Sequence, residues 1–314
     1  MTPVTPDLVV LGNLLVDDVV HADGRTRMGE PGGAMLYASL AAALWGARVG
    51  CVSLRGDDYP ATALDTLRAR GVLLDGVHAL EGNGVRTWLL YEGDVRRVIH
   101  RLGCPSHEAV SPLPEHVPPA WRRARAFHLA PMPIDTQRSL VSAIRGWEAP
   151  EAPAFVSVDP HLPLAPDTLP AWRALLVDVD AFFPSDDEWR LPDAARDPAA
   201  ALAALAPPAH ARLRWIAWKR GAAGGSLYDV RERRLHAWPA RAARIEDPTG
   251  AGDAFMAGFV TAYLEARGVE HCLRRAVVSA SFAIESCGAE RLAAATRVEA
   301  EARLAAWDAT EVRP

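Results

Sequence analysis

The sequence is poor in lysine and in cysteine. Lys219 is the only lysine among 34 basic residues, and with so much alanine and proline this arginine excess indicates a GC-rich coding bias. The four cysteines, Cys51, Cys104, Cys272 and Cys287, are widely separated and form no Cys-x-x-Cys or mixed Cys/His zinc pattern. We therefore expect reduced thiols and no structural metal.

The sequence also lacks the segments that direct a chain to membranes or nucleic acids. No apolar run approaches the ~20 residues of a membrane span, and residues 1–13 have neither the basic start nor the apolar length of a signal peptide. The net charge is −5, which gives no reason to expect a nucleic-acid backbone or an anionic membrane as partner. We expect a cytoplasmic protein that acts on small molecules.

The first 70 residues alternate between strand and helix patterns. Apolar runs at 8–12 and 48–54 predict buried strands, and periodic segments at 34–45 and 61–70 predict helices. The polar segment 17–30 is expected to be a turn-rich loop. This β–loop–α–β–α order is typical of a parallel sheet with crossover helices.

The remaining chain mostly continues this alternation. A predicted hairpin, 85–91 with 95–101, interrupts it and indicates a small sheet that stands off the main one. Further short strands are expected at 126–129, 154–159, 181–184 and 215–219, a second hairpin at 225–238, and helices at 136–145, 172–177, 199–205, 251–267, 271–286 and 297–306.

The strongest chemical signal is the stretch 247–259, DPTGAGDAFMAGF. Gly250 and Gly252 flank Ala251, which lets backbone N–H groups converge without side-chain interference. An apolar helix follows at once, so its free N–H groups and its positive end favour an anion there. Asp253 in the first turn places a carboxylate beside that anion. Phosphoryl transfer requires this pairing of charge-stabilising donors with a base.

This stretch closely resembles the C-terminal motif of the ribokinase-like (PfkB) carbohydrate kinases. The resemblance implies that the backbone of Gly250, Ala251 and Gly252 forms an anion hole and that Asp253 is the catalytic base. It implies one ribokinase-like α/β domain over 1–314, with a doubly wound, mostly parallel sheet between helices. It also implies a small β-sheet lid formed by about 13–31 and 84–103.

Other segments are similar to the acceptor and metal sites of that family. Asp17 lies where the family's first strand supplies an acid for acceptor hydroxyls, and Gly32 with Gly33 resembles its substrate-side glycine pair. Ser185 and Glu188 fall on the family's Asn-x-x-Glu motif, which implies that Glu188 acts near magnesium and Ser185 near the nucleotide.

The nucleotide side is matched by three segments. Lys219 with Gly221 and Gly224 resembles the family's nucleotide strand and glycine loop, and Gly288 belongs to a turn that resembles the one beside adenine. Thr249 lies where some relatives build a potassium site from backbone carbonyls. The resemblance thus implies ATP and Mg²⁺ as cofactors, leaves a monovalent cation open, and makes a homodimer through the lid an expectation.

The sequence departs from the family pattern at several positions. Tyr37 replaces an acceptor-binding Asn four residues after Gly33; this favours an inositol-like polyol over ribose, although Tyr37 packing inside the helix is the alternative. Ser185 replaces an Asn, and His161 replaces the Asn of an Asp-Pro-Asn strand end, where a structural hydrogen bond is expected. Arg96 follows the hairpin turn and is either an acceptor contact or a solvated residue.

Two other nucleotide sites are excluded. No G-x-x-x-x-G-K-[ST] loop occurs, and Gly12 is not part of a G-x-G-x-x-G turn. We expect an ATP-dependent kinase for a hydroxyl of a small polyol or sugar. A nucleoside kinase, with Tyr37 or Trp88 as a platform for the base, and a non-catalytic metabolite-binding relative are the alternatives.

Overall fold

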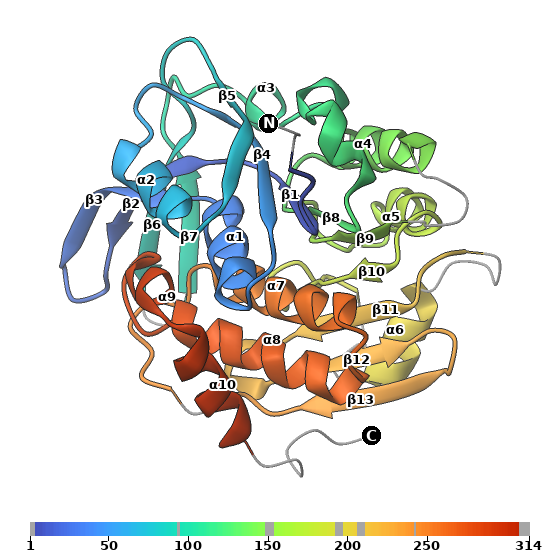
Figure 1. The fold of residues 1–314 in the computed structure, drawn as a ribbon. Helices are drawn as coiled ribbons and strands as arrows, with labels where there is room; N and C mark the ends of the chain where they lie inside the picture. The colour runs from blue at the N-terminus through green and yellow to red at the C-terminus, as the bar shows by residue number, and fades with distance from the viewer. Residues whose placement is uncertain are drawn as a thin grey trace.

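The protein contains one large and one small β-sheet (Figure 1). The computed structural model describes residues 4–92, 95–147, 154–191, 197–205, 211–241 and 243–307, without the side chains of Val95 and Arg96. In this described part the large sheet has nine strands in the order β13-β12-β11-β10-β9-β8-β1-β4-β5. They are β1 Leu8–Leu11, β4 Val49–Arg55, β5 Leu73–Ala79, β8 Ala126–Leu129, β9 Phe155–Val158, β10 Ala181–Phe182, β11 Trp215–Lys219, β12 Gly225–Asp229 and β13 Arg234–Trp238.

The large sheet is parallel from β11 to β5, and β12 and β13 extend it as an antiparallel hairpin. Strand β1 lies in the interior of the sheet, between β8 and β4, and is buried on both sides, as expected of a continuous apolar run. Leu8 and Val10 contribute to one hydrophobic core, and Val9 and Leu11 to another. The predicted doubly wound, mostly parallel sheet is confirmed, and β5 is a strand that the sequence reading missed.

Helices cover both faces of this sheet and define the two cores (Figure 1). The Leu8 core includes α1 Ala34–Leu44, α2 Ala61–Ala69, α7 Ala251–Leu264, α8 Val269–Ala283, α9 Glu290–Ala294 and α10 Arg297–Ala305. The Val9 core includes α4 Ile134–Trp147, α5 Leu169–Leu176 and α6 Pro198–Leu205. Short elements complete the chain: α3 His107–Val110, η1 Pro114–His116, η2 Pro119–Arg123 and η3 Gly221–Ala223.

The small sheet has the order β3-β2-β6-β7 and stands beside the N-terminal half of the large sheet (Figure 1). Its strands are β2 Leu15–Val20, β3 Thr26–Gly32, β6 Arg86–Glu92 and β7 Val95–His100. Strands β2 and β3 pair antiparallel, β2 and β6 parallel, and β6 and β7 antiparallel.

The expectation of a loop over 17–30 is therefore wrong, because β2 and β3 occupy most of it. Two adjacent acidic residues, Asp17 and Asp18, gave β2 the polar sequence that is typical of a loop. Successive side chains of a strand point to opposite faces, so Asp17 and Asp18 point to opposite faces of β2. Asp18 accepts two hydrogen bonds of 2.7 Å from Arg86 and one of 2.9 Å from the Gly29 amide. A buried carboxylate with these donors is compatible with a sheet interior.

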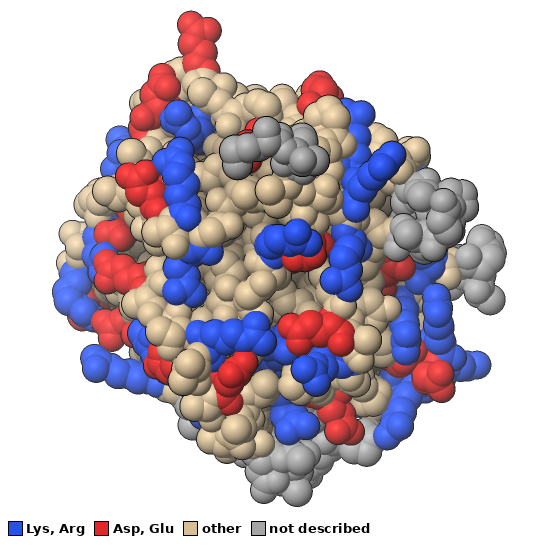
Figure 2. Space-filling model, in the orientation of Figure 1, with Lys and Arg blue, Asp and Glu red and all other residues tan. Residues whose placement is uncertain are grey.

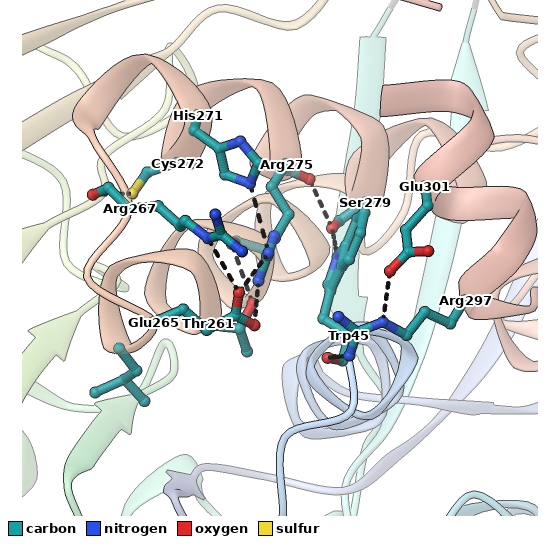
Figure 3. Close-up of polar contacts among 12 residues, drawn as sticks. Trp45, Thr261, Glu265, Arg267, His271, Cys272, Arg275, Ser279, Arg297 and Glu301 are labelled. Carbon is teal, nitrogen blue, oxygen red and sulfur yellow. Dashed lines mark hydrogen bonds and ion pairs between the residues drawn. The ribbon is translucent and has the colours of Figure 1, made fainter. Parts of the chain in front are cut away.

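Polar contacts hold the remote ends of the helices on the Leu8 side together (Figure 3). Arg275 on α8 is 3% exposed and donates two hydrogen bonds of 2.8 Å to Glu265, which follows α7. The indole N–H of Trp45, at the end of α1, donates to the Ser279 hydroxyl at 2.7 Å, and Arg297 donates to the Trp45 carbonyl. These contacts fix α1, α7 and α8 relative to one another.

Charged side chains of both signs are interspersed over the face shown in Figure 2. None of the helices in the described part of the chain is long and apolar enough to cross a membrane.

Candidate active site

The residues that the motifs single out gather at the carboxyl ends of the parallel strands. Asp159 follows β9, Ser185 lies shortly after β10, and Lys219 ends β11. Ligands of open α/β sheets bind at this edge. Helix α7 begins at the same place, directly after the glycine turn.

The glycine turn has the geometry that an anion site requires. Gly250 caps α7 in a left-handed conformation, φ 77°, which favours glycine, and Asp253 lies in the first turn of the helix. The Thr249 amide donates to Asp247 Oδ1 at 2.9 Å, and the Ala251 amide donates to the Pro248 carbonyl at 3.3 Å. The turn thus directs a helix N-terminus and the Asp253 carboxylate to the same edge of the sheet.

Tyr37 supports this turn. A Cβ on Gly250 would lie 2.1 Å from Tyr37 Cγ, so only a glycine leaves room for the ring. Tyr37 is 2% exposed, and burial, together with the carboxylates of Asp247, Asp17 and Asp253, raises its pKa well above the ordinary value. The ring therefore packs within the site, so it presents no open face to a ligand.

Asp17 of β2 reaches the same site from the small sheet. A Cβ on Gly32 would lie 2.0 Å from Asp17 Oδ2, so the carboxylate fits only because residue 32 is glycine. Gly33 caps α1 with φ 97°, against the Asn13 carbonyl. Asp17, Gly32 and Gly33 thus lie together at the start of α1, as the resemblance implies.

Lys219 connects the nucleotide strand to the glycine turn. Its Nζ donates to Asp159 Oδ1 at 3.0 Å and would lie 3.0 Å from a Cβ on Gly252. Asp159 is 2% exposed. Burial raises its pKa to about 7, opposed by Lys219 and reinforced by the nearby carboxylates of Asp253 and Glu188. These groups therefore form one electrostatic cluster around the start of α7.

Ser185 and Glu188 form a local turn beside Lys219. Glu188 Oε2 accepts a hydrogen bond of 2.6 Å from the Ser185 amide and another from the Ser185 hydroxyl. Ser185 also forms an isolated parallel bridge with Lys219. Within the described ranges, no three His, Cys, Asp or Glu side chains are grouped closely enough to hold a metal by themselves.

The remaining predicted nucleotide residues lie in two loops, one after β11 and one between α8 and α9. Gly221 begins η3, two residues after Lys219, and Gly224 follows its last residue; a Cβ on Gly224 would meet the Trp238 carbonyl at 2.0 Å. Gly288 faces Glu30 of the small sheet, with Glu30 Oε2 3.5 Å from a Cβ on this glycine. Arg96 pairs with Tyr91 in the β6–β7 register, but its side chain lies outside the described residues.

Tyr91 is a residue that the sequence reading missed. Its hydroxyl donates to Asp247 Oδ1 at 2.7 Å and lies 3.0 Å from Thr249 Oγ1, and its ring stacks on His21. The small sheet is therefore attached directly to the turn before α7. An aromatic residue in a strand is ordinary, so no sequence signal distinguishes Tyr91.

His161 lies in a cluster of imidazoles. His161 Nε2 is 3.2 Å from His107 Nδ1, and His107 packs near His100 of β7. Burial and the two neighbouring rings lower the pKa of His107 to about 4, and burial also lowers the pKa of His161. The cluster connects the small sheet to the loop after β9.

A protein-family model matches nearly the whole chain. The family model described as pfkB family carbohydrate kinase matches residues 6–295. The chain belongs to the PfkB family of carbohydrate kinases.

Individual relatives cover most of the chain. A cytidine kinase of Thermococcus kodakarensis is 31% identical over 276 residues, 85% of this chain and 92% of the relative. A fructokinase of Escherichia coli is 28% identical over 265 residues, 80% and 82% of the two chains. The fold is similar to that of a ribokinase II from Escherichia coli, with a TM-score of 0.73 and 18% identity over 96% of this chain and 99% of the other.

Proposed function

We propose that this kinase transfers the γ-phosphoryl group of ATP to a hydroxyl of a small sugar, polyol or nucleoside, with Asp253 as the base. The observation that carries the proposal is the start of α7, where the left-handed Gly250 turn and Asp253 come together with Lys219 and Asp17. A helix N-terminus stabilises phosphoryl charge, and a carboxylate beside it accepts the proton of an attacking hydroxyl.

The transfer is direct and in line. Asp253 takes the proton of the acceptor hydroxyl while that oxygen forms a bond to the γ-phosphorus. The bond from this phosphorus to the β–γ bridging oxygen breaks, and its electron pair leaves with ADP. The amides of Gly250, Ala251 and Gly252 face the developing charge; the Ala251 amide exchanges its long bond to Pro248 for the phosphoryl oxygen. Asp17, with Gly32 and Gly33, holds the acceptor.

The described residues fit ATP and magnesium. Lys219 and the loop through Gly221 and Gly224 supply a cation and backbone amides on the nucleotide side, and the family resemblance adds Gly288 beside the adenine. Mg²⁺ prefers oxygen ligands and usually keeps several waters. Glu188, oriented through one oxygen by Ser185, would hold such a water, and the ion would supply neutralisation of phosphate charge.

For the acceptor, the cytidine kinase relative favours a nucleoside. Neither residue suggested as a platform for its base is suitable, however. Tyr37 is buried beneath Gly250. Trp88 is an odd number of positions from Tyr91 in β6, so it points to the opposite face from the residue that contacts Asp247. An inositol-like acceptor is the second prediction, after a nucleoside. It rests only on the presence of Tyr37 where the family has an Asn.

Three further expectations remain proposals. A homodimer through the lid is supported by Val98 and Ile99 of β7, which are 52% and 48% exposed and offer apolar area for a partner copy. A monovalent cation near Thr249 and Ala289 and a cytoplasmic location rest on the family resemblance and on the sequence.

An ADP-release assay with MgATP tests the function. The acceptor panel contains cytidine, adenosine, myo-inositol, ribose, fructose and 2-keto-3-deoxygluconate. We expect one class of acceptor to raise ADP release well above the acceptor-free rate. If every acceptor leaves that rate unchanged while calorimetry shows a panel compound binding tightly, the non-catalytic reading replaces the kinase.

A further inference from the structure

The only lysine of the chain lies at the phosphoryl end of the site. Every other basic side chain is one of 33 arginines, since the sequence has 34 basic residues in total. A coding bias toward arginine explains the 33 arginines but does not explain why residue 219 is a lysine. Lysine and arginine differ chemically: an ammonium is a compact point charge, whereas a guanidinium is a broad planar fork. We therefore ask which property of position 219 favours the compact ammonium of lysine over a guanidinium.

The surroundings of Lys219 accept a compact cation. The Nζ atom is 3.0 Å from Asp159 Oδ1, and a Cβ on Gly252 would approach it to 3.0 Å. The side chain is 14% exposed. The ammonium thus fills the space between a buried carboxylate and the backbone of the glycine turn, where a guanidinium would need more room.

The charges around Lys219 predict that it can change partners. Asp253 and Glu188 both lie within electrostatic reach of Asp159, as their effects on its pKa show. A γ-phosphoryl group beside Asp253 adds further negative charge at the same place. The ammonium is already next to Gly252, so a small rotation of its flexible stem brings it from Asp159 to that group.

Asp159 has a second donor in reach when Lys219 leaves. His128 is fully buried, with its Nδ1 3.0 Å from the Ser157 hydroxyl and its Nε2 4.0 Å from Asp159 Oδ2. That Nε2 has no hydrogen-bond partner among the described residues. Burial and the Lys219 charge keep the pKa of His128 well below its ordinary value, so the ring is neutral. In the tautomer in which Nδ1 accepts a hydrogen bond from the Ser157 hydroxyl, Nε2 carries the proton and faces Asp159.

We propose that Lys219 is a catalytic residue whose ammonium moves from Asp159 to the transferred phosphoryl group, and that Asp159 is the positioning residue that holds it between turnovers. This inference rests on the proposed kinase function. Lys219 then contacts the γ-phosphoryl group, and its contribution is larger in the transition state than with ADP bound.

The single lysine makes this movement directly observable. Protein labelled with lysine carrying ¹³C at Cε gives one side-chain signal in a ¹H–¹³C spectrum. We expect the signal to shift when Mg·AMP-PNP binds, because this analogue carries a γ-phosphoryl group, and to stay near the free position with MgADP. Calorimetry on the same samples shows whether each nucleotide binds.

Variants with matched controls test the catalytic role. Lys219→Met should lower kcat about 10²-fold, the usual loss for one charge-stabilising donor, while the Kd of MgADP changes less than about threefold. Lys219→Arg should not recover the rate, because the guanidinium does not fit beside Gly252. Arg214 and Asp229 form a 3.8 Å ion pair at the opposite end of β11, so Arg214→Met and Asp229→Asn serve as controls and should leave kcat nearly unchanged.

The possible outcomes distinguish a failure of the Lys219 inference from a failure of the proposed kinase function. A shift with Mg·AMP-PNP alone, together with a kcat-specific loss in Lys219→Met, supports the inference. Equal shifts with both nucleotides, or no shift while both bind, overturn it and leave the kinase function standing. Failure of either nucleotide to bind overturns the proposed function and the inference together.

Discussion

Single residues in this site act through their neighbours. Tyr37 takes the place of a family Asn, yet its ring supports the Gly250 turn and is buried. Tyr91 connects the small sheet to Asp247, and Asp159 holds Lys219. The GAGD stretch and the glycine pair were predictable because they form contiguous motifs. Tyr91 and the Lys219–Asp159 pair were not, because their partners lie 156 and 60 residues away along the chain.

Tyr91→Phe should reduce turnover while the protein remains folded. The variant keeps the ring but removes a donor from the buried Asp247 carboxylate. Hydrogen bonds to charged groups contribute about 1.5–3 kcal/mol, so we expect kcat to fall about tenfold or more. Steady-state kinetics with the acceptor found in the panel measures this. Tyr263→Phe, at the remote end of α7 where the ring packs on Phe155, is the control. Equal kcat values in the two variants would contradict the role of Tyr91.

At the scale of elements, strands with apolar runs were predictable and strands with buried charge were not. Strand β1 is apolar on both faces and was identified. Strand β2 carries Asp17 for the site on one face and Asp18 for Arg86 on the other, so its polarity resembles that of a loop. The same acidic pattern that hides β2 from a sequence reading places the Asp17 carboxylate beside Gly32, near the start of α1.

Arg86→Met should destabilise the small sheet. It removes both hydrogen bonds to Asp18, whose side chain is fully buried, while Arg101 at 3.7 Å compensates in part. We expect a loss of about 1–3 kcal/mol in the free energy of unfolding, measured by urea titration, and faster amide exchange in β2 and β6. The control is Arg97→Met, since Arg97 forms an exposed pair with Glu92 in the same sheet and should cost less than about 1 kcal/mol. A smaller effect for Arg86→Met than for the control would refute this account of β2.

For the whole molecule, the strand–helix alternation predicts the large sheet, while the relation between the two sheets depends on side chains. Tyr91 attaches the small sheet to the turn before α7, and the contacts of Figure 3 fix the other end of the same helix. Helix α7 is therefore held at both ends. Such long-range contacts follow from packing, and one sequence without its structure contains no local pattern for them.

The contact between Glu265 and Arg275 should make stability depend on pH. Hydrogen bonds from Arg275 lower the pKa of Glu265 in the folded state. Its contribution is therefore complete above the unfolded value of about 4.3 and is lost as the pH falls through the folded pKa. Glu265→Gln should be less stable than wild type at pH 7, and the difference should shrink toward pH 3.5. Urea titrations over this range, with Glu270→Gln on α8 as control, measure it; a difference independent of pH would contradict the assignment.

The account depends most on Asp253 as the base for phosphoryl transfer. The direct measurement is kcat of Asp253→Asn with MgATP and the acceptor found in the panel, alongside Kd for MgADP. Loss of a general base typically costs about 10²–10⁴-fold, so we predict a fall of that size with nucleotide affinity nearly unchanged. Turnover close to wild type in Asp253→Asn would show that the carboxylate at the start of α7 is not the base.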